Sequence, residues 1–108
     1  MDRQARRLYR LKAQIVQAAA HPIRLAIIDF LSGGGQCVCD ISAHVGAKRS
    51  NVSRHLSVML SSGALDCRKD GLKVIYSLKT PCILKFLDCV TDVLRDQVRQ
   101  SQSVLSRL

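Results

Sequence analysis

The chain has 108 residues, a length that fits one folded domain and excludes a multidomain enzyme. Hydrophobic residues make up 47% of it and aromatic residues only 4%, which predicts an aliphatic core and excludes disorder over most of the length. Lys and Arg number 17 against 8 acidic residues, a formal net charge of +9, and this excess indicates a polyanionic partner, either nucleic acid or an anionic membrane surface.

The N-terminal part predicts two helices in a cytoplasmic protein. No run of about 18 apolar residues could span a bilayer, and the charged start 1–7 is not followed by the apolar segment of a signal peptide. From Leu8 to Ala19 apolar residues recur at helical spacing, while the opposite face is rich in Arg. Pro22 suits the first position of a second helix, which we expect over about 22–31.

The middle of the chain predicts a helix-turn-helix over residues 37–62. A short segment with helical periodicity lies between Cys37 and Gly46, and a longer one covers 47–62. Gly46 can adopt the left-handed backbone conformation that a sharp turn between two helices needs. Such a motif offers its second helix to DNA. Three apolar residues of that helix should face the core: Val52, Leu56 and Met59.

A β-hairpin should follow over 64–78. Residues 64–69 and 73–78 have strand character and flank Asp70-Gly71, a dipeptide that favours a tight two-residue turn. A hairpin directly after a helix-turn-helix is the wing of a winged-helix domain.

The last segment predicts one long helix. Thr80-Pro81 supplies a capping residue and a first-turn proline, and apolar residues recur at helical spacing as far as Val98. The expected fold is therefore mainly α, a winged helix-turn-helix with the order ααααββα, in a single domain over residues 1–108. Because so small a domain buries a limited core, we expect the helices within 1–20 and 80–108 to form a dimer interface; packing within one chain is the alternative.

Basic and polar side chains gather where DNA contacts are expected. Cations can neutralise phosphates, and Ser and Asn side chains can bond phosphates or base edges. On the second helix of the motif the candidate DNA-binding residues are Lys48, Arg49, Ser50, Asn51, Ser53, Arg54 and His55. Of these, the groove-facing set is Arg49, Asn51, Ser53 and Arg54. Arg68, Lys69 and Lys73 of the wing should contact phosphates or the minor groove. A face that is merely solvated is the alternative, and charges on a helix-turn-helix disfavour a membrane partner.

The five cysteines are the remaining candidates for chemistry, and we interpret them as thiols rather than disulfides. Cys37 and Cys39 would point about 200° apart in a regular helix, so joint binding of one ion requires the first helical turn to loosen. Cys82 lies at the start of the last helix, where the helix dipole favours a thiolate, and Cys89 lies about 10.5 Å further along the same face. Cys67 is expected in the core.

The donor set favours soft ions over hard ones. Thiolates without convergent carboxylates suit As(III), Sb(III), Cd(II), Pb(II) or Cu(I). His21, His44 and His55 have no ligand spacing, and we expect none of them to bind metal. The chain lacks a Cys-x-x-Cys motif, a Ser/His/Asp set and paired carboxylates, so we expect no enzyme and no cofactor needed for DNA binding.

Between about Gln14 and Asp96 the chain resembles the ArsR/SmtB family of winged-helix metalloregulatory repressors. Four stretches carry the resemblance. His21–Leu25 resembles the opening of the family's second helix, and Cys37–Ile41 resembles its thiolate segment. Asn51–Leu56 resembles its recognition helix, and Asp70–Leu78 resembles its wing. The resemblance implies a homodimer that binds double-stranded operator DNA and is released by an inducer. One departure is Lys48, where family members often have a Ser or Thr cap; either Ser50 caps a later start or the helix is uncapped.

The resemblance also narrows the inducer. Zinc-sensing members carry an Asp/His set on the terminal helix, whereas the matching positions here are Thr80, Cys82, Val93 and Asp96. Cadmium/lead sensors add a Cys from an N-terminal arm, and no Cys precedes Cys37. The chain thus resembles the arsenite-responsive type, with As(III) bound by Cys37, Cys39 and a third sulfur from Cys82 or Cys89, within one chain or across the dimer. The alternative is a repressor of the same fold that senses persulfide or oxidant.

Overall fold

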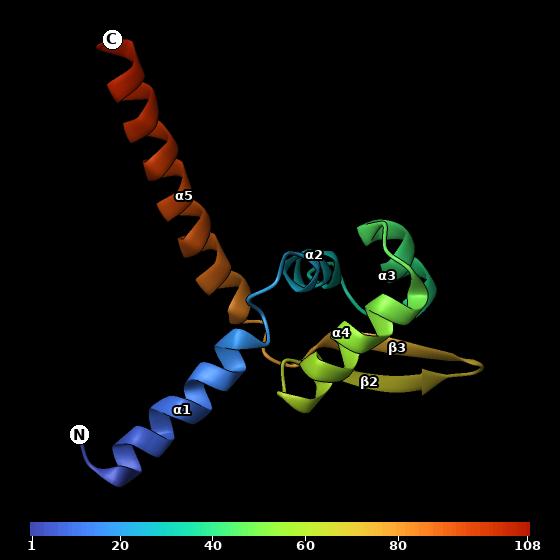
Figure 1. Ribbon diagram of the computed structural model, residues 1–108. Coiled ribbons are helices and arrows are strands. Elements are labelled where there is room, and N and C mark those ends of the chain that lie inside the picture. Colours follow the sequence, from blue (N-terminus) through green and yellow to red (C-terminus); the bar gives the residue numbers. More distant parts are fainter.

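The computed structural model describes residues 1–108, and its elements follow the expected order with one addition (Figure 1). The elements are α1 (Arg3–Gln17), α2 (Pro22–Leu31), β1 (Gln36–Cys37), α3 (Val38–Val45), α4 (Arg49–Ser61), β2 (Leu65–Asp70), β3 (Lys73–Leu78) and α5 (Ile83–Ser106). The mainly helical winged helix-turn-helix is confirmed, with α3 and α4 as its motif and β2–β3 as its wing. The addition is the short strand β1, which the sequence pattern did not predict.

The wing belongs to a three-stranded antiparallel sheet in the order β1-β3-β2. β1 pairs Cys37 with Ile75, and it can do so because Gly35 lies beside it: a Cβ there would come within 2.6 Å of the Ile75 side chain. In the hairpin Asp70 pairs with Lys73, so the two-residue loop is Gly71-Leu72 and not the expected Asp70-Gly71. Gly71 has φ 64°, a left-handed conformation that glycine adopts without a steric penalty.

The core lies between α2, α3, α4 and the start of β2. Val52, Leu56 and Met59 of α4 are fully buried there, as expected from their spacing. They pack in one cluster with Ala19, Ile27, Ile28, Leu31, Ile41, Ala64 and Leu65. Full burial of an aliphatic side chain of this size stabilises a fold by about 1.5–3 kcal/mol, so this cluster fixes how α4 sits on the domain. Ser42 of α3 is the one buried polar residue.

The helix ends show which local signals operate. α1 begins at Arg3, before the apolar stripe that starts at Leu8, and the Asp2 carboxylate caps it by accepting a hydrogen bond of 2.7 Å from the Ala5 amide. α2 has its expected bounds: Pro22 occupies the first turn and the His21 imidazole Nδ1 accepts from the Ile23 amide at 3.1 Å. α3 ends at Val45 and is followed by Gly46, whose φ is 69°.

α4 and α5 begin without a side-chain cap. Lys48 makes no capping hydrogen bond, so of the two expected possibilities the start of α4 is uncapped. α5 begins at Ile83, three residues later than Thr80, because the amides of Ile83, Leu84 and Lys85 bond the carbonyls three residues before them. Such i→i+3 bonds form a tighter turn than the α-helix, and Cys82 is therefore the residue just before α5.

α1 and α5 extend away from the body formed by the other elements (Figure 1). Neither helix contains a buried residue, and the chain has a radius of gyration of 17.2 Å. A compact domain of this length has a radius of about 13 Å. Each helix leaves large apolar side chains exposed, including Leu11 and Ile15 on α1 and Val90, Leu94 and Val98 on α5. None of the helices is long and apolar enough to cross a lipid bilayer.

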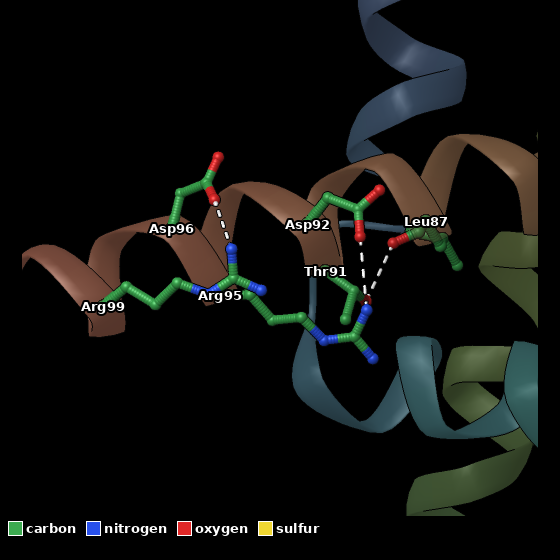
Figure 2. A network of polar contacts seen from close by, with 6 residues as sticks. All are labelled: Leu87, Thr91, Asp92, Arg95, Asp96 and Arg99. Carbon is green, nitrogen blue, oxygen red and sulfur yellow. Dashed lines mark hydrogen bonds and ion pairs between the residues drawn. The ribbon is translucent and has the colours of Figure 1, made fainter.

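The opposite face of α5 is polar (Figure 2). Arg95 pairs with Asp92 at 3.3 Å and Arg99 pairs with Asp96 at 3.8 Å, each one turn apart, and Thr91 donates to the Leu87 carbonyl. All four charged side chains are exposed, so these pairs add little to stability. They keep one side of α5 hydrated and leave the apolar stripe as the side that can be covered.

Candidate nucleic-acid interface and thiol site

The residues of α4 that do not enter the core form a basic surface. Burial of Val52, Leu56 and Met59 on one side of the helix places the intervening residues on the other side. Lys48, Arg49, Ser50, Ser53 and Arg54 are exposed, whereas Asn51 and His55 are half-buried. No acidic residue lies in the first turn and no side chain caps it, so the first amides of α4 can donate to phosphate oxygens.

The wing carries the second basic group. Arg68 and Lys69 of β2 and Lys73 of β3 are all exposed, and the hairpin extends away from the body beside α4 (Figure 1). Lys69 lies opposite Val74 and Arg68 opposite Ile75, so each cation faces an uncharged partner across the hairpin. Lys73 lies opposite Asp70. The wing and α4 thus present separate basic surfaces that suit one extended polyanion.

A polar cluster that the sequence analysis missed lies behind α4. Arg24 of α2 donates from Nε to Nδ1 of His55 at 3.1 Å, and from Nη1 to the Ala18 carbonyl at 3.4 Å. The rings of His21 and His55 lie 4.4 Å apart between centroids. Burial, and then the nearby positive charges, hold the pKa of His55 below its ordinary value of 6.5. The single hint in the sequence is that His21 and Arg24 are one helical turn apart.

The three histidines have contacts within the protein. His21 caps α2, and His55 accepts from Arg24. His44 of α3 stacks on Phe30 of α2, with 4.1 Å between ring centroids and an interplanar angle of 11°. Each imidazole therefore takes part in packing between helices or in capping.

Cys37 and Cys39 lie at the junction of β1 and α3 but in different environments. Cys37 is the residue just before α3 and is buried, whereas Cys39 is exposed. Because Cys37 has an extended backbone and lies outside α3, the angle expected for two cysteines in a regular helix does not apply to this pair. The Arg49 guanidinium donates through Nη2 to the Cys39 sulfur, which links the exposed thiol to the first residue of α4.

The prediction that Cys67 belongs to the core is wrong. Cys67 is exposed, because β2 enters the core only at Leu65 and its remaining residues, in the projecting hairpin, are all exposed. Its cross-strand partner is Tyr76. Burial, with a smaller contribution from Cys67, raises the pKa of Tyr76 above its ordinary value of 10.0.

The other two cysteines lie apart from the first pair. Cys82 and Cys89 are exposed, and Cys82 lines an apolar pocket of about 310 Å³ between the end of α1 and the start of α5. α5 and α3 lie on opposite sides of α2 in Figure 1. No group of three or more His, Cys, Asp or Glu side chains is placed to hold a metal ion. Of the two arrangements expected for a three-sulfur site, the one within a single chain is therefore not formed.

Comparisons with known proteins agree with this architecture. The family model described as bacterial regulatory protein, arsR family, matches residues 21–65. The uncharacterized HTH-type transcriptional regulator Rv0081 of Mycobacterium tuberculosis (strain H37Rv) is 34% identical over 102 residues, which cover 94% of this chain and 90% of that protein. Its crystal structure superposes with a TM-score of 0.76, covering 86% of this chain and 94% of that one at 33% identity.

Two further relatives bear on ligand and assembly. The arsenical resistance operon repressor of Escherichia coli K12 is 38% identical over 69 residues, 63% of this chain and 59% of that protein. The homodimeric winged helix-turn-helix DNA-binding domain of Mb0332 from Mycobacterium bovis has a TM-score of 0.79 and covers 93% of both chains at 22% identity. The latter likeness shows the shared fold.

Proposed function

The chain belongs to the ArsR family of bacterial regulatory proteins, DNA-binding regulators of transcription rather than enzymes, and we propose that it is a homodimeric repressor released from its operator by a thiophilic ion. The observation that carries the DNA-binding part is the exposed basic surface of α4 beside the cationic wing. In the proposed complex, Arg49, Asn51, Ser53 and Arg54 enter the major groove. Arg68, Lys69 and Lys73 contact the phosphate backbone of the DNA or its minor groove.

The homodimer is proposed because nothing within one chain covers the apolar faces of α1 and α5. Both have long exposed apolar stripes and no buried residue. Pairing across a two-fold axis would bury the stripes and place two α4 helices roughly 34–36 Å apart, one turn of duplex DNA. The operator would then be a near-palindrome. In this proposal the helix-turn-helix spans residues 37–62 and the wing spans 64–78. The dimerisation segments are 1–20 and 80–108.

The proposed inducer is As(III), and Cys37 and Cys39 are its proposed ligands. Support comes from the soft donor set, and the relative that shares 38% identity represses an arsenical resistance operon. In this proposal Cys37 and Cys39 supply two sulfurs, and the third comes from Cys82 or Cys89 across the dimer, an arrangement supported by the absence of a three-ligand group within one chain. Engaging Cys39 would take its sulfur from Arg49, and engaging Cys37 would draw it out of the junction of β1 and α3. Both changes would act on the start of α4. The DNA-bound state and the ion-bound state would therefore differ in their contacts there, as release by an inducer requires.

The second candidate is a repressor that senses persulfide or oxidant through thiols. The observation in its favour is that Cys39, Cys67, Cys82 and Cys89 are all exposed, while no three-ligand group exists in the chain. Exposed thiols are accessible to oxidation. The helix α2, where related sensors usually carry one of the two cysteines, contains none.

Titration of the operator complex separates these candidates. The complex is challenged with arsenite, antimonite, cadmium, lead, zinc, copper and sulfane sulfur, and release is followed by fluorescence anisotropy. We expect arsenite to release the parent and to fail with Cys37→Ser and Cys39→Ser, while Cys67→Ser, an exposed thiol outside the site, behaves like the parent. If both Cys37→Ser and Cys39→Ser respond normally and a Cys82→Ser or Cys89→Ser variant does not, sensing belongs to α5.

A further inference from the structure

Arg24 is the side chain that joins three helices of the domain. It belongs to α2, donates to His55 of α4, and donates to the carbonyl of Ala18, the residue that ends α1. Ala18 is buried, so this bond lies inside the junction of the helices. Beyond it, α1 buries none of its helical residues. Arg24 therefore connects a helix of the proposed dimer interface to the helix that is proposed to read DNA.

The Arg24–His55 bond requires a neutral imidazole. A guanidinium is always protonated and can only donate, so Nδ1 of His55 has to accept. The proton of the neutral ring then lies on Nε2. A protonated His55 would carry N–H groups on both nitrogens, and a donor would face a donor across 3.1 Å.

The charged and titratable groups around His55 oppose its protonation. It faces the cation Arg24 of α2, the imidazole of His21 just before α2, and Arg54 of its own helix. The end of α1 contributes a carbonyl but no charged side chain. No carboxylate pairs with Arg24, since the ion pairs of the chain are both on α5. Protonation would thus add a positive charge to a cluster that has no counterion.

We propose that Arg24 is a positioning residue for operator binding, which holds His55 neutral and ties α4 to the end of α1, so that acidification weakens the repressor–operator complex. This proposal rests on the proposed function. The direction in which operator affinity changes on acidification distinguishes this role from simple phosphate contact. A histidine that only contacts phosphate binds DNA more tightly when protonated, because it gains a positive charge. Loss of the Arg24–His55 bond predicts the opposite.

The first experiment measures operator affinity of the full-length chain at about pH 8 and about pH 5.5 at fixed salt, a range that spans histidine titration. We expect the affinity of the parent to fall at the lower pH, by less than about tenfold, because a pKa of His55 below 6.5 limits the fraction that is protonated at pH 5.5. His55→Gln, which cannot titrate, should lose this pH dependence, and Arg24→Gln should reduce it. His44→Gln is the matched control, because His44 stacks on Phe30 outside the cluster, and its profile should follow the parent.

The second experiment observes His55 directly by NMR of the free protein, with ¹⁵N-labelled histidine. At about pH 8 we expect the proton on Nε2 and an unprotonated Nδ1, and Arg24→Gln should raise the pKa of His55 towards that of an ordinary histidine. Affinity that is constant or rises on acidification would overturn the proposal, and so would a proton on Nδ1 or a His55→Gln variant that keeps the parental pH dependence. A parent that binds no operator at either pH overturns the proposed function instead, while the NMR result still decides the Arg24–His55 contact.

Discussion

Replacing Ser42 of α3 by Ala should stabilise the folded chain. Ser42 is only 9% exposed, and its hydroxyl oxygen is buried without a hydrogen-bond partner. A buried polar group that is left unsatisfied costs about 1–3 kcal/mol, and Ala adds up to roughly 0.5 kcal/mol of helix propensity over Ser. The backbone carbonyl of Ser42, which accepts from Gly46 and Ala47, is unchanged by the substitution. We therefore expect the free energy of unfolding to rise by about 1–3 kcal/mol.

Urea unfolding followed by circular dichroism, at one fixed protein concentration, measures this change. The matched control is Ser57→Ala on α4, a substitution of the same type at an exposed helical position. It shares the gain in helix propensity and lacks the buried hydroxyl, so the difference between the two variants isolates the unsatisfied group. An unfolding free energy for Ser42→Ala equal to or below that of Ser57→Ala would show that the hydroxyl has a partner in solution, and the reasoning would fail.

Three further predictions concern DNA, assembly and pH. Arg49→Ala and Arg54→Ala should each weaken operator binding by about 1–3 kcal/mol and spare random DNA, whereas Lys73→Ala should weaken both and flatten the salt dependence by about one unit; equal losses on both DNAs would reassign the arginines to phosphate contact. Leu94→Asp places a charge in the apolar stripe of α5, where Leu94 is 58% exposed in the single chain, and should give monomers or unfolded protein in sedimentation; an intact dimer would show that the stripe is not the interface. Because the pKa of His55 is lowered on folding, the unfolded state binds more protons below about pH 6.5, so the free energy of unfolding should fall as pH drops through that range and fall less in His55→Gln.

Much of the fold could be predicted because its elements have strong local signals. α2 has the predicted bounds since Pro22 marks its start, and the spacing of Val52, Leu56 and Met59 identified the buried side of α4. β1 could not be predicted in this way. It has two residues, too few for any periodicity, and it exists only because β3 offers it a partner across the close approach at Gly35.

The candidate site could be predicted where exposure follows from helical geometry, and it could not where tertiary contacts decide. The basic surface of α4 follows from the side that its core residues occupy. The Arg24–His55 bond joins residues 31 positions apart, and no local pattern brings them together. Cys67 was misplaced because alternation along a strand predicts a core face only where a core covers that strand.

Because α1 and α5 project from the body, the stability of the chain should depend on protein concentration. An isolated helix of the length of α1, 15 residues, is only marginally stable in water, and helices in proteins gain most of their stability from packing of an apolar face. We therefore expect α1 and α5 to reach full order when another surface covers their apolar stripes. If that surface is a second copy, association and ordering are one equilibrium, and mass action governs both. Dilution would then melt these helices before the core, and amide exchange in α1 and α5 would slow as the protein concentration is raised. The number of copies in a cell would thereby set both how much repressor is assembled and how much of each chain is folded.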